Sequence, residues 1–240
     1  LGIWQDGDLS LAVPHGWAPV GMCYNNKYVT MPAADQVTYA MTLEPEFEGR
    51  ISIQENFHRN FIEYAPAVTG FEDVDLQTPE GLRWDLPDDV LKRTKEEMIR
   101  ARKNFKLLFK TAGDAARSVA TEEIYICVIS AFVAQEAADA GNPNIDFVIP
   151  RAHLATGWID GQGWVNNTNN NEATLEWINH FGDVESQISI ISKSWLNSTN
   201  RECLDALTAA GHGEKLKKLG SYDHDADFIN SISLFKPVNN

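Results

Sequence analysis

Short apolar segments rich in β-branched residues alternate with helical segments, and this alternation restricts the fold more than any other feature of the sequence. The run EIYICVIS (123–130) predicts a buried strand, and AFVAQEAADA directly after it predicts a helix that ends at Gly141. Strands separated by helices indicate an α/β fold with at least one partly parallel sheet. Further strands are expected at 8–13, 20–24, 49–53, 145–150, 157–165 and 231–237.

The expected helices differ in how clearly they begin and end. Asn56 has the side chain of a helix N-cap and precedes an amphipathic segment. The apolar periodicity of 88–109 predicts one long helix with a charged outer face, whereas 14–17 (PHGW) is expected to separate two strands. Residues 199–202 have the pattern of a capping box that opens a helix reaching position 210. Other helices are expected at 33–42, 112–119, 171–181 and 184–192.

Composition and charge exclude several classes of protein. The 240 residues carry 34 acidic and 20 basic side chains, and the net charge of −14 opposes binding to nucleic-acid phosphates. No apolar run approaches the roughly 20 residues that a membrane-spanning helix needs. The three cysteines lie far apart, so no disulfide framework is indicated, and Cys127 is predicted to be a buried thiol. No signal peptide is visible at the start, which is expected of a mature form or of a chain that lacks upstream residues.

Catalytic and metal-binding motifs give no positive signal. The sequence contains no GxSxG, HExxH, P-loop or GxGxxG pattern, and its six histidines do not fall at metal-ligand spacing. Residues 223–225 (DHD) could bind a metal, but a solvated loop is the preferred interpretation. Glu122 and Glu123 could form an acid–base pair, although they stand where a strand begins. The sequence therefore predicts neither a metal site nor a cofactor.

Several tryptophans stand at strand ends or in loops, beside Gly, Pro or Asp: Trp17, Trp84, Trp158, Trp164 and Trp195. Packing in a core explains any one of them. Several at element ends also suit a cleft that stacks flat or cationic groups. Asp160 is two residues from Trp158 and would point to the same face of a strand. A carboxylate beside an indole face is a chemically sensible site for an ammonium group.

Six segments in the same order resemble a known family: VPHGWAPVGMCYN, EPEFEGRISI, NIDFVIP, ATGWIDGQGWV, EATLEWINHFGDVESQ and KSWLNSTNRECLDAL. The chain resembles bacterial extracellular solute-binding proteins of ABC importers, of the spermidine/putrescine type. The resemblance implies a two-lobe periplasmic binding protein-like fold (type II), with ligand held between α/β lobes. Residues 1–19 and 146–240 would form lobe 1, and 20–145 would form lobe 2. The family has a further stretch upstream, so lobe 1 is expected to be incomplete.

The resemblance also implies which residues face the ligand. The family's cleft aromatic and acid fall on Trp158 and Asp160, and a later aromatic falls on Trp195. Where polyamine binders carry an acidic pair after the strand RISIQEN, this sequence has Asn56 and Arg59. Arg59 either favours an anionic or zwitterionic ligand through its bidentate guanidinium or is an exposed arginine in the first turn of a helix. Trp17 joins this set of candidate ligand-binding residues as an aromatic side chain at a strand end.

The expected function is therefore ligand capture in the periplasm, or outside a membrane to which the protein is anchored, and delivery to ABC permease subunits. The ligand would be a polyamine, an amine or an amino-acid-like compound, and no reaction would be catalysed. Two alternatives remain open. One is an α/β hydrolase-like enzyme that uses Asp160 or Glu123 as general base in the same cleft. The other is a fragment without a competent binding site.

Overall fold

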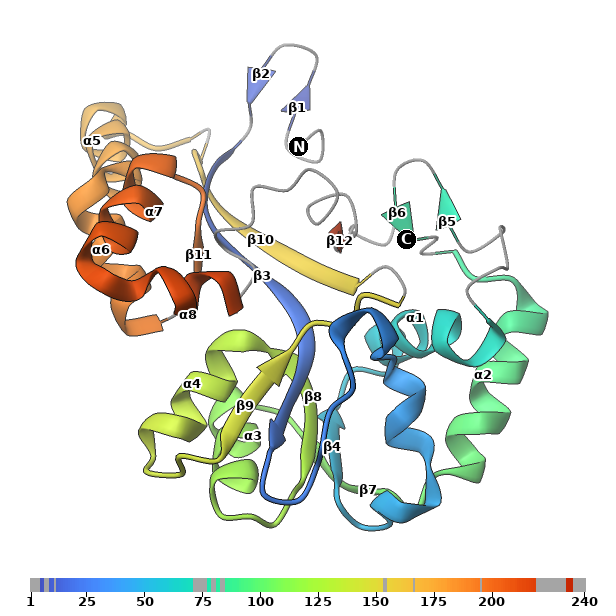
Figure 1. Cartoon of the computed structure of the whole chain (residues 1–240). Helices are drawn as coiled ribbons and strands as arrows, with labels where there is room; N and C mark the ends of the chain where they lie inside the picture. The colour runs from blue at the N-terminus through green and yellow to red at the C-terminus, as the bar shows by residue number, and fades with distance from the viewer. Residues whose placement is uncertain are drawn as a thin grey trace.

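The structure is a computed structural model in which one long strand, β3 (Ala12–Asn25), belongs to two regions of sheet (Figure 1). The first half of β3 pairs with β10 (Ala155–Gly163) and β11 (Asn197–Ser198). The second half pairs with β8 (Ile126–Ser130) and β9 (Ile145–Val148). All four of these neighbours are antiparallel to β3. The residues that the structure describes are 5–6, 9–10, 12–70, 77–78, 81–82, 85–152, 155–165, 167–194, 196–218 and 232–234.

Parallel strands complete both regions of sheet. Next to β8 lie β4 (Ile51–Gln54) and then β7 (Phe105–Phe109), and β8, β4 and β7 run parallel. On the far side of β10 lies β12 (Ile232–Leu234), which runs parallel to β10. Two hairpins are separate from this sheet, and their strands are β1 (Gln5–Asp6), β2 (Leu9–Ser10), β5 (Gln77–Thr78) and β6 (Gly81–Leu82).

Helices follow the strands in the order that the sequence predicts for an α/β fold. The α-helices are α1 (Phe57–Thr69), α2 (Asp88–Arg100), α3 (Ala112–Ala120), α4 (Ala131–Asp139), α5 (Asn171–Gly182), α6 (Val184–Ser194), α7 (Arg201–Leu207) and α8 (Gly213–Lys218). Short 3-10 helices occupy Ala34–Gln36, Tyr39–Leu43 and Pro45–Phe47, and a π-helical turn spans Thr208–His212. None of the helices in these described ranges is long and apolar enough to cross a membrane.

Two apolar clusters cover the two faces of the β8–β4–β7 sheet. Helices α3 and α4 pack on one face, where their alanines and valines meet Cys127 and Ile129 of β8. Helix α1 and the 3-10 helices pack on the other face, where Tyr64 meets Ile53 of β4 and Val128 of β8. A third cluster joins α6, α7 and α8. This arrangement confirms the predicted α/β class, and the predicted burial of Cys127 is also confirmed.

Two expectations about strands were wrong. Residues 14–17 do not separate two strands, because β3 continues through them, and a register shift opposite Asp160 and Gly161 of β10 leaves His15 as the extra residue of a bulge in β3. The helix predicted over 88–109 ends at Arg100, and the chain returns through a turn as strand β7. In β7 the positions Lys106 and Leu108 are exposed while Phe109 is buried, which is the alternation of a strand and not the period of a helix.

The expected ends of helices were mostly correct. Asn56 caps α1 by accepting a hydrogen bond from the backbone N–H of Arg59. Gly141 follows the C-cap of α4 with a φ of 101°, in the left-handed region that favours glycine. Helix α7 is capped by Asn200, whose side chain accepts from the N–H of Glu202, rather than by the predicted threonine at 199.

Candidate functional site

The carboxyl ends of β4 and β8 form an edge of the sheet at which the chain leaves in opposite directions. After β4 the chain enters α1 on one face, and after β8 it enters α4 on the other face. Ile53 of β4 lies opposite Val128 of β8, so Gln54 and Ser130 end these neighbouring strands side by side. In open α/β sheets such a switch point leaves a crevice outside the strand ends, where ligands bind. This geometry makes the β4–β8 edge the candidate site.

Strand β10 supplies the facing side of this site. Thr156, Trp158 and Asp160 are alternate residues of β10, so they share one face of the strand. Their exposure rises along the strand, because Thr156 is fully buried, Trp158 is partly buried and Asp160 is exposed. The row therefore runs from the packed interior to the surface.

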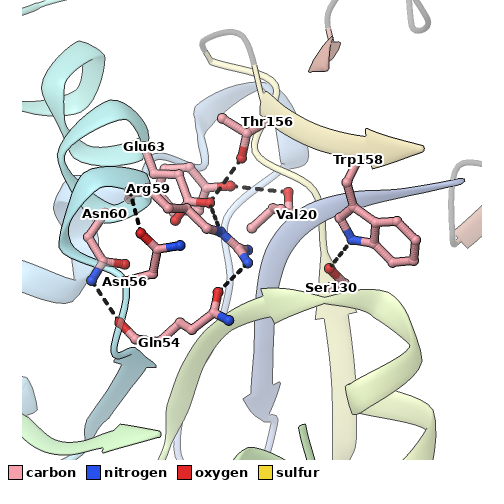
Figure 2. Close-up of polar contacts among 10 residues, drawn as sticks. Val20, Gln54, Asn56, Arg59, Asn60, Glu63, Ser130, Thr156 and Trp158 are labelled. Carbon is pink, nitrogen blue, oxygen red and sulfur yellow. Dashed lines mark hydrogen bonds and ion pairs between the residues drawn. The ribbon is translucent and has the colours of Figure 1, made fainter. Parts of the chain in front are cut away.

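Two residues of the β8–α4 junction hold the indole ring of Trp158 in place. The indole Nε1–H donates to the Oγ atom of Ser130 at 2.8 Å (Figure 2). The rings of Phe132 and Trp158 lie nearly perpendicular, at 86°, with their centroids 6.4 Å apart. Ser130 stands at the N-cap position of α4 but makes no side-chain capping bond. Its side chain is therefore committed to orienting the indole, which is the aromatic surface that the sequence predicts for a ligand.

A buried polar network lies at the carboxyl end of β4 and in the helix α1 that follows it. The Nε–H of Arg59 donates to Oε1 of Glu63 at 2.5 Å, and an Nη1–H of the same guanidinium donates to Oε1 of Gln54 at 2.6 Å. Thr156 Oγ1 donates to the same oxygen of Glu63 at 3.0 Å, which connects α1 to β10 (Figure 2). Arg59 is 11% exposed and Glu63 is 1% exposed. Tyr39 lies beside this network, and its pKa is raised by burial and by the charge of Glu63.

The network excludes one of the two interpretations of Arg59. It is not an exposed arginine, because its side chain is almost entirely enclosed and engaged by Glu63 and Gln54. Asn56 is exposed, and its oxygen caps α1. Both residues follow β4 directly, and the Asn56 oxygen and the Arg59 guanidinium are used in hydrogen bonds within the protein.

The tryptophans are separated by the structure. Trp17 and its neighbour on β3 lie opposite residues 159 and 158 of β10, so Trp17 and Trp158 leave opposite faces of this strand pair. Trp17 packs against the cluster beneath α3 and α4, whereas Trp158 packs against the cluster beneath α1. Trp164 is 40% exposed after the end of β10. Trp195 and Trp84 lie outside the described residues.

The candidate acid–base groups do not share this site. Glu123 precedes β8 and therefore lies at the amino end of the sheet, where it pairs with Lys106 at 2.9 Å, so it was wrong to place it in the same cleft as Asp160. Glu122 pairs with Lys27 at 2.9 Å at that same end. In the part of the chain that the structure describes, no three His, Cys, Asp or Glu side chains gather as metal ligands would. The DHD segment at 223–225 lies outside the described residues.

Sequence reasoning missed four residues of the site: Gln54, Glu63, Ser130 and Thr156. Two of them had a usable signal, because Gln54 and Ser130 directly end predicted strands, where side chains of an α/β fold meet ligands. Glu63 stands four residues after Arg59, a spacing typical of a surface ion pair on a helix. Only the packing of β10 and Tyr39 over α1 shows that this pair is buried.

Comparisons with known proteins agree with this architecture. No family model matches the sequence, and no curated protein matches it. Solved structures do match: the spermidine/putrescine substrate-binding protein PotD of Streptococcus pneumoniae superposes with a TM-score of 0.77 at 14% identity, covering 100% of this chain and 67% of that one. The PotD lipoprotein of Treponema pallidum gives 0.70 at 19% identity, covering 97% and 65%. The periplasmic binding protein MotA of A. tumefaciens, solved with glucopine, gives 0.68 at 12% identity, covering 98% and 68%.

The chain therefore has the fold of the substrate-binding proteins of ABC transporters, which confirms the predicted resemblance and fold class. It spans about two thirds of the length of the solved structures named. The first of them is a spermidine/putrescine ABC transporter substrate-binding protein, and the third is a periplasmic binding protein in complex with glucopine.

Proposed function

We propose that this chain is the ligand-capturing part of a solute-binding protein that serves an ABC importer. Its ligand would be a small polar compound in the polyamine, amine or amino-acid range, held in the crevice between the β4–β8 edge and β10. Residues 20–145 would form one lobe and residues 1–19 with 146–240 the other, with β3 passing between them. The protein would act in the periplasm or anchored outside a membrane, and would hand its ligand to permease subunits.

The observation that carries this proposal is the way Trp158 is fixed at the switch point. An indole whose N–H donates to Ser130 and whose ring has Phe132 as a perpendicular neighbour, both at the β8–α4 junction, offers its ring at a constant place and angle. Such pre-organisation raises affinity, because the ligand need not immobilise the side chain. Asp160 follows on the same face, so an ammonium group against the indole would have a carboxylate within its surroundings.

A thermal-shift titration tests the proposal. Polyamines, betaines, amino acids and carboxylates are added to the chain, and a ligand that binds the folded state raises the melting temperature by mass action. We expect one of these classes to raise it, and Trp158→Ala to abolish the rise while leaving the unliganded chain folded. Trp164→Ala is the matched control, because it removes an exposed tryptophan beyond the end of β10. No shift with any class, or equal shifts in Trp158→Ala, would contradict the proposal.

A further inference from the structure

We propose that Gln54 is the residue that selects the ligand's end group, and that its amide NH2 donates to a carboxylate of the ligand. The consequence is a preference for carboxylate-bearing compounds over diamines. This inference rests on the proposed function and adds the chemical class of ligand to it.

The first step is the orientation of the Gln54 amide. A guanidinium has only N–H donors, so the atom of Gln54 that faces Arg59 at 2.6 Å has to be the amide oxygen. Arg59 is itself held by Glu63, and Glu63 receives a second hydrogen bond from Thr156. A chain of buried contacts therefore leaves the NH2 group of Gln54 turned away from Arg59, as Figure 2 shows.

The second step is where this NH2 group lies. Gln54 is the last residue of β4 and is partly exposed, and the register places it beside the end of β8. Asn56 lies two residues further on, and its amide oxygen accepts from the backbone N–H of Arg59. Both amides therefore use their oxygens inside the protein, and their NH2 groups can donate to a ligand at this end of the sheet. Donors suit the oxygens of a ligand and repel an ammonium group, which is a donor only.

The third step is the charge around these donors. Glu63 is 1% exposed, so the protein encloses its carboxylate, which is shared by Arg59 and Thr156. Glu55, between the two amides, reaches Lys110 at 3.4 Å. The exposed carboxylate on the facing side is Asp160, on β10 beside Trp158. A compound with a carboxylate at one end and an ammonium at the other would meet a complementary group on each side.

Three four-carbon compounds test this inference because they differ only in their end groups. Putrescine has two ammonium ends, 4-aminobutanoate has one ammonium and one carboxylate, and succinate has two carboxylates. Isothermal titration calorimetry of the chain with each compound gives three dissociation constants. We expect 4-aminobutanoate to bind tighter than putrescine by about ten- to a hundredfold, as for a hydrogen bond to a charged group.

Gln54→Glu provides the decisive variant. Glutamate keeps an oxygen for Arg59 and replaces the outward NH2 by a second oxygen, so putrescine is expected to become the tighter ligand of the two. Asn144→Asp makes the same exchange of amide for carboxylate before β9, at the opposite end of the sheet, and should leave the order unchanged. Tighter binding of putrescine by the natural chain, or an unchanged order in Gln54→Glu, would overturn this inference and leave the proposed function standing. Binding of none of the three compounds would count against the proposed function as well.

Discussion

A buried ion pair at the carboxyl end of the β8–β4–β7 sheet contrasts with an exposed ion pair at its amino end. At the carboxyl end the pair between Arg59 and Glu63 is 11% and 1% exposed and shares a network with Gln54 and Thr156. At the amino end Glu122 contacts Lys27 at 2.9 Å with both side chains partly exposed to water. The same chemical groups therefore serve different purposes at the two ends.

Desolvation explains this difference. An exposed pair gains little, because water already solvates each charge well and salt screens the attraction. A buried pair is costly to assemble, but removing one partner leaves the other charge without compensation. The carboxyl end therefore keeps its side chains in one arrangement, which a binding site requires, while the amino end tolerates change.

Removal of Glu63 is expected to have the largest effect on stability, and it tests whether the buried pair matters more than an exposed one. Glu63→Ala leaves the enclosed guanidinium of Arg59 without its carboxylate, and we expect the free energy of unfolding to fall by about 3–5 kcal/mol. Urea denaturation measures the loss. Glu97→Ala on α2 is the control, because it removes the carboxylate from a helical pair with Arg100 that is 40% and 58% exposed.

The control should cost at most about 1 kcal/mol. Equal losses in the two variants would mean that the Arg59–Glu63 pair is solvated in solution, and the distinction between the two ends of the sheet would then fail.

Ser130 provides a smaller test at the same end. Ser130→Ala removes the acceptor of the Trp158 indole N–H, and the unfolding free energy should fall by about 1–3 kcal/mol. Loss of a helix cap does not contribute, because the Ser130 side chain makes no capping bond to α4. A double-mutant cycle with Trp158→Phe isolates the contact. If the two losses simply add, the hydrogen bond does not hold the indole.

Much of the architecture could be predicted from local signals. The α/β class, the cap at Asn56 and the stop at Gly141 depend on residues close together in the chain, where periodicity and capping rules apply. The error at PHGW has a physical origin: Pro14 and Gly16 disfavour strands locally, but β3 has paired neighbours on both sides near this segment. Similarly, the apolar spacing of 101–109 fits a helix as well as it fits strand β7.

The site was predicted only in part for a related reason. Trp158 and Asp160 stand next to glycines in one strand, so the sequence shows them as a local pair. The role of Arg59 depends on Glu63, Gln54 and Thr156. Glu63 and Thr156 are 93 positions apart in the chain, and only packing brings them together. No local rule states whether an arginine on a helix is enclosed by a distant strand.

A substitution at the exposed amino end of the sheet has the smallest expected effect on stability, and this effect depends on pH. Hydrogen bonds from Tyr28 and from Lys27 hold the pKa of Glu122 below its ordinary value of 4.5. A lowered pKa in the folded state means that Glu122 stabilises the fold above about pH 4.5 and loses this contribution as the pH falls through its folded-state pKa. Glu122→Gln should therefore lower the melting temperature slightly at pH 7, and its difference from the melting temperature of the natural chain should vanish in acid.

Glu46→Gln, which removes an exposed charge elsewhere, controls for the change in net charge. If the difference in melting temperature stayed constant down to pH 3, the contribution of Glu122 would not depend on its ionisation. The exposed pair at the amino end would then not behave as an ordinary ion pair in water.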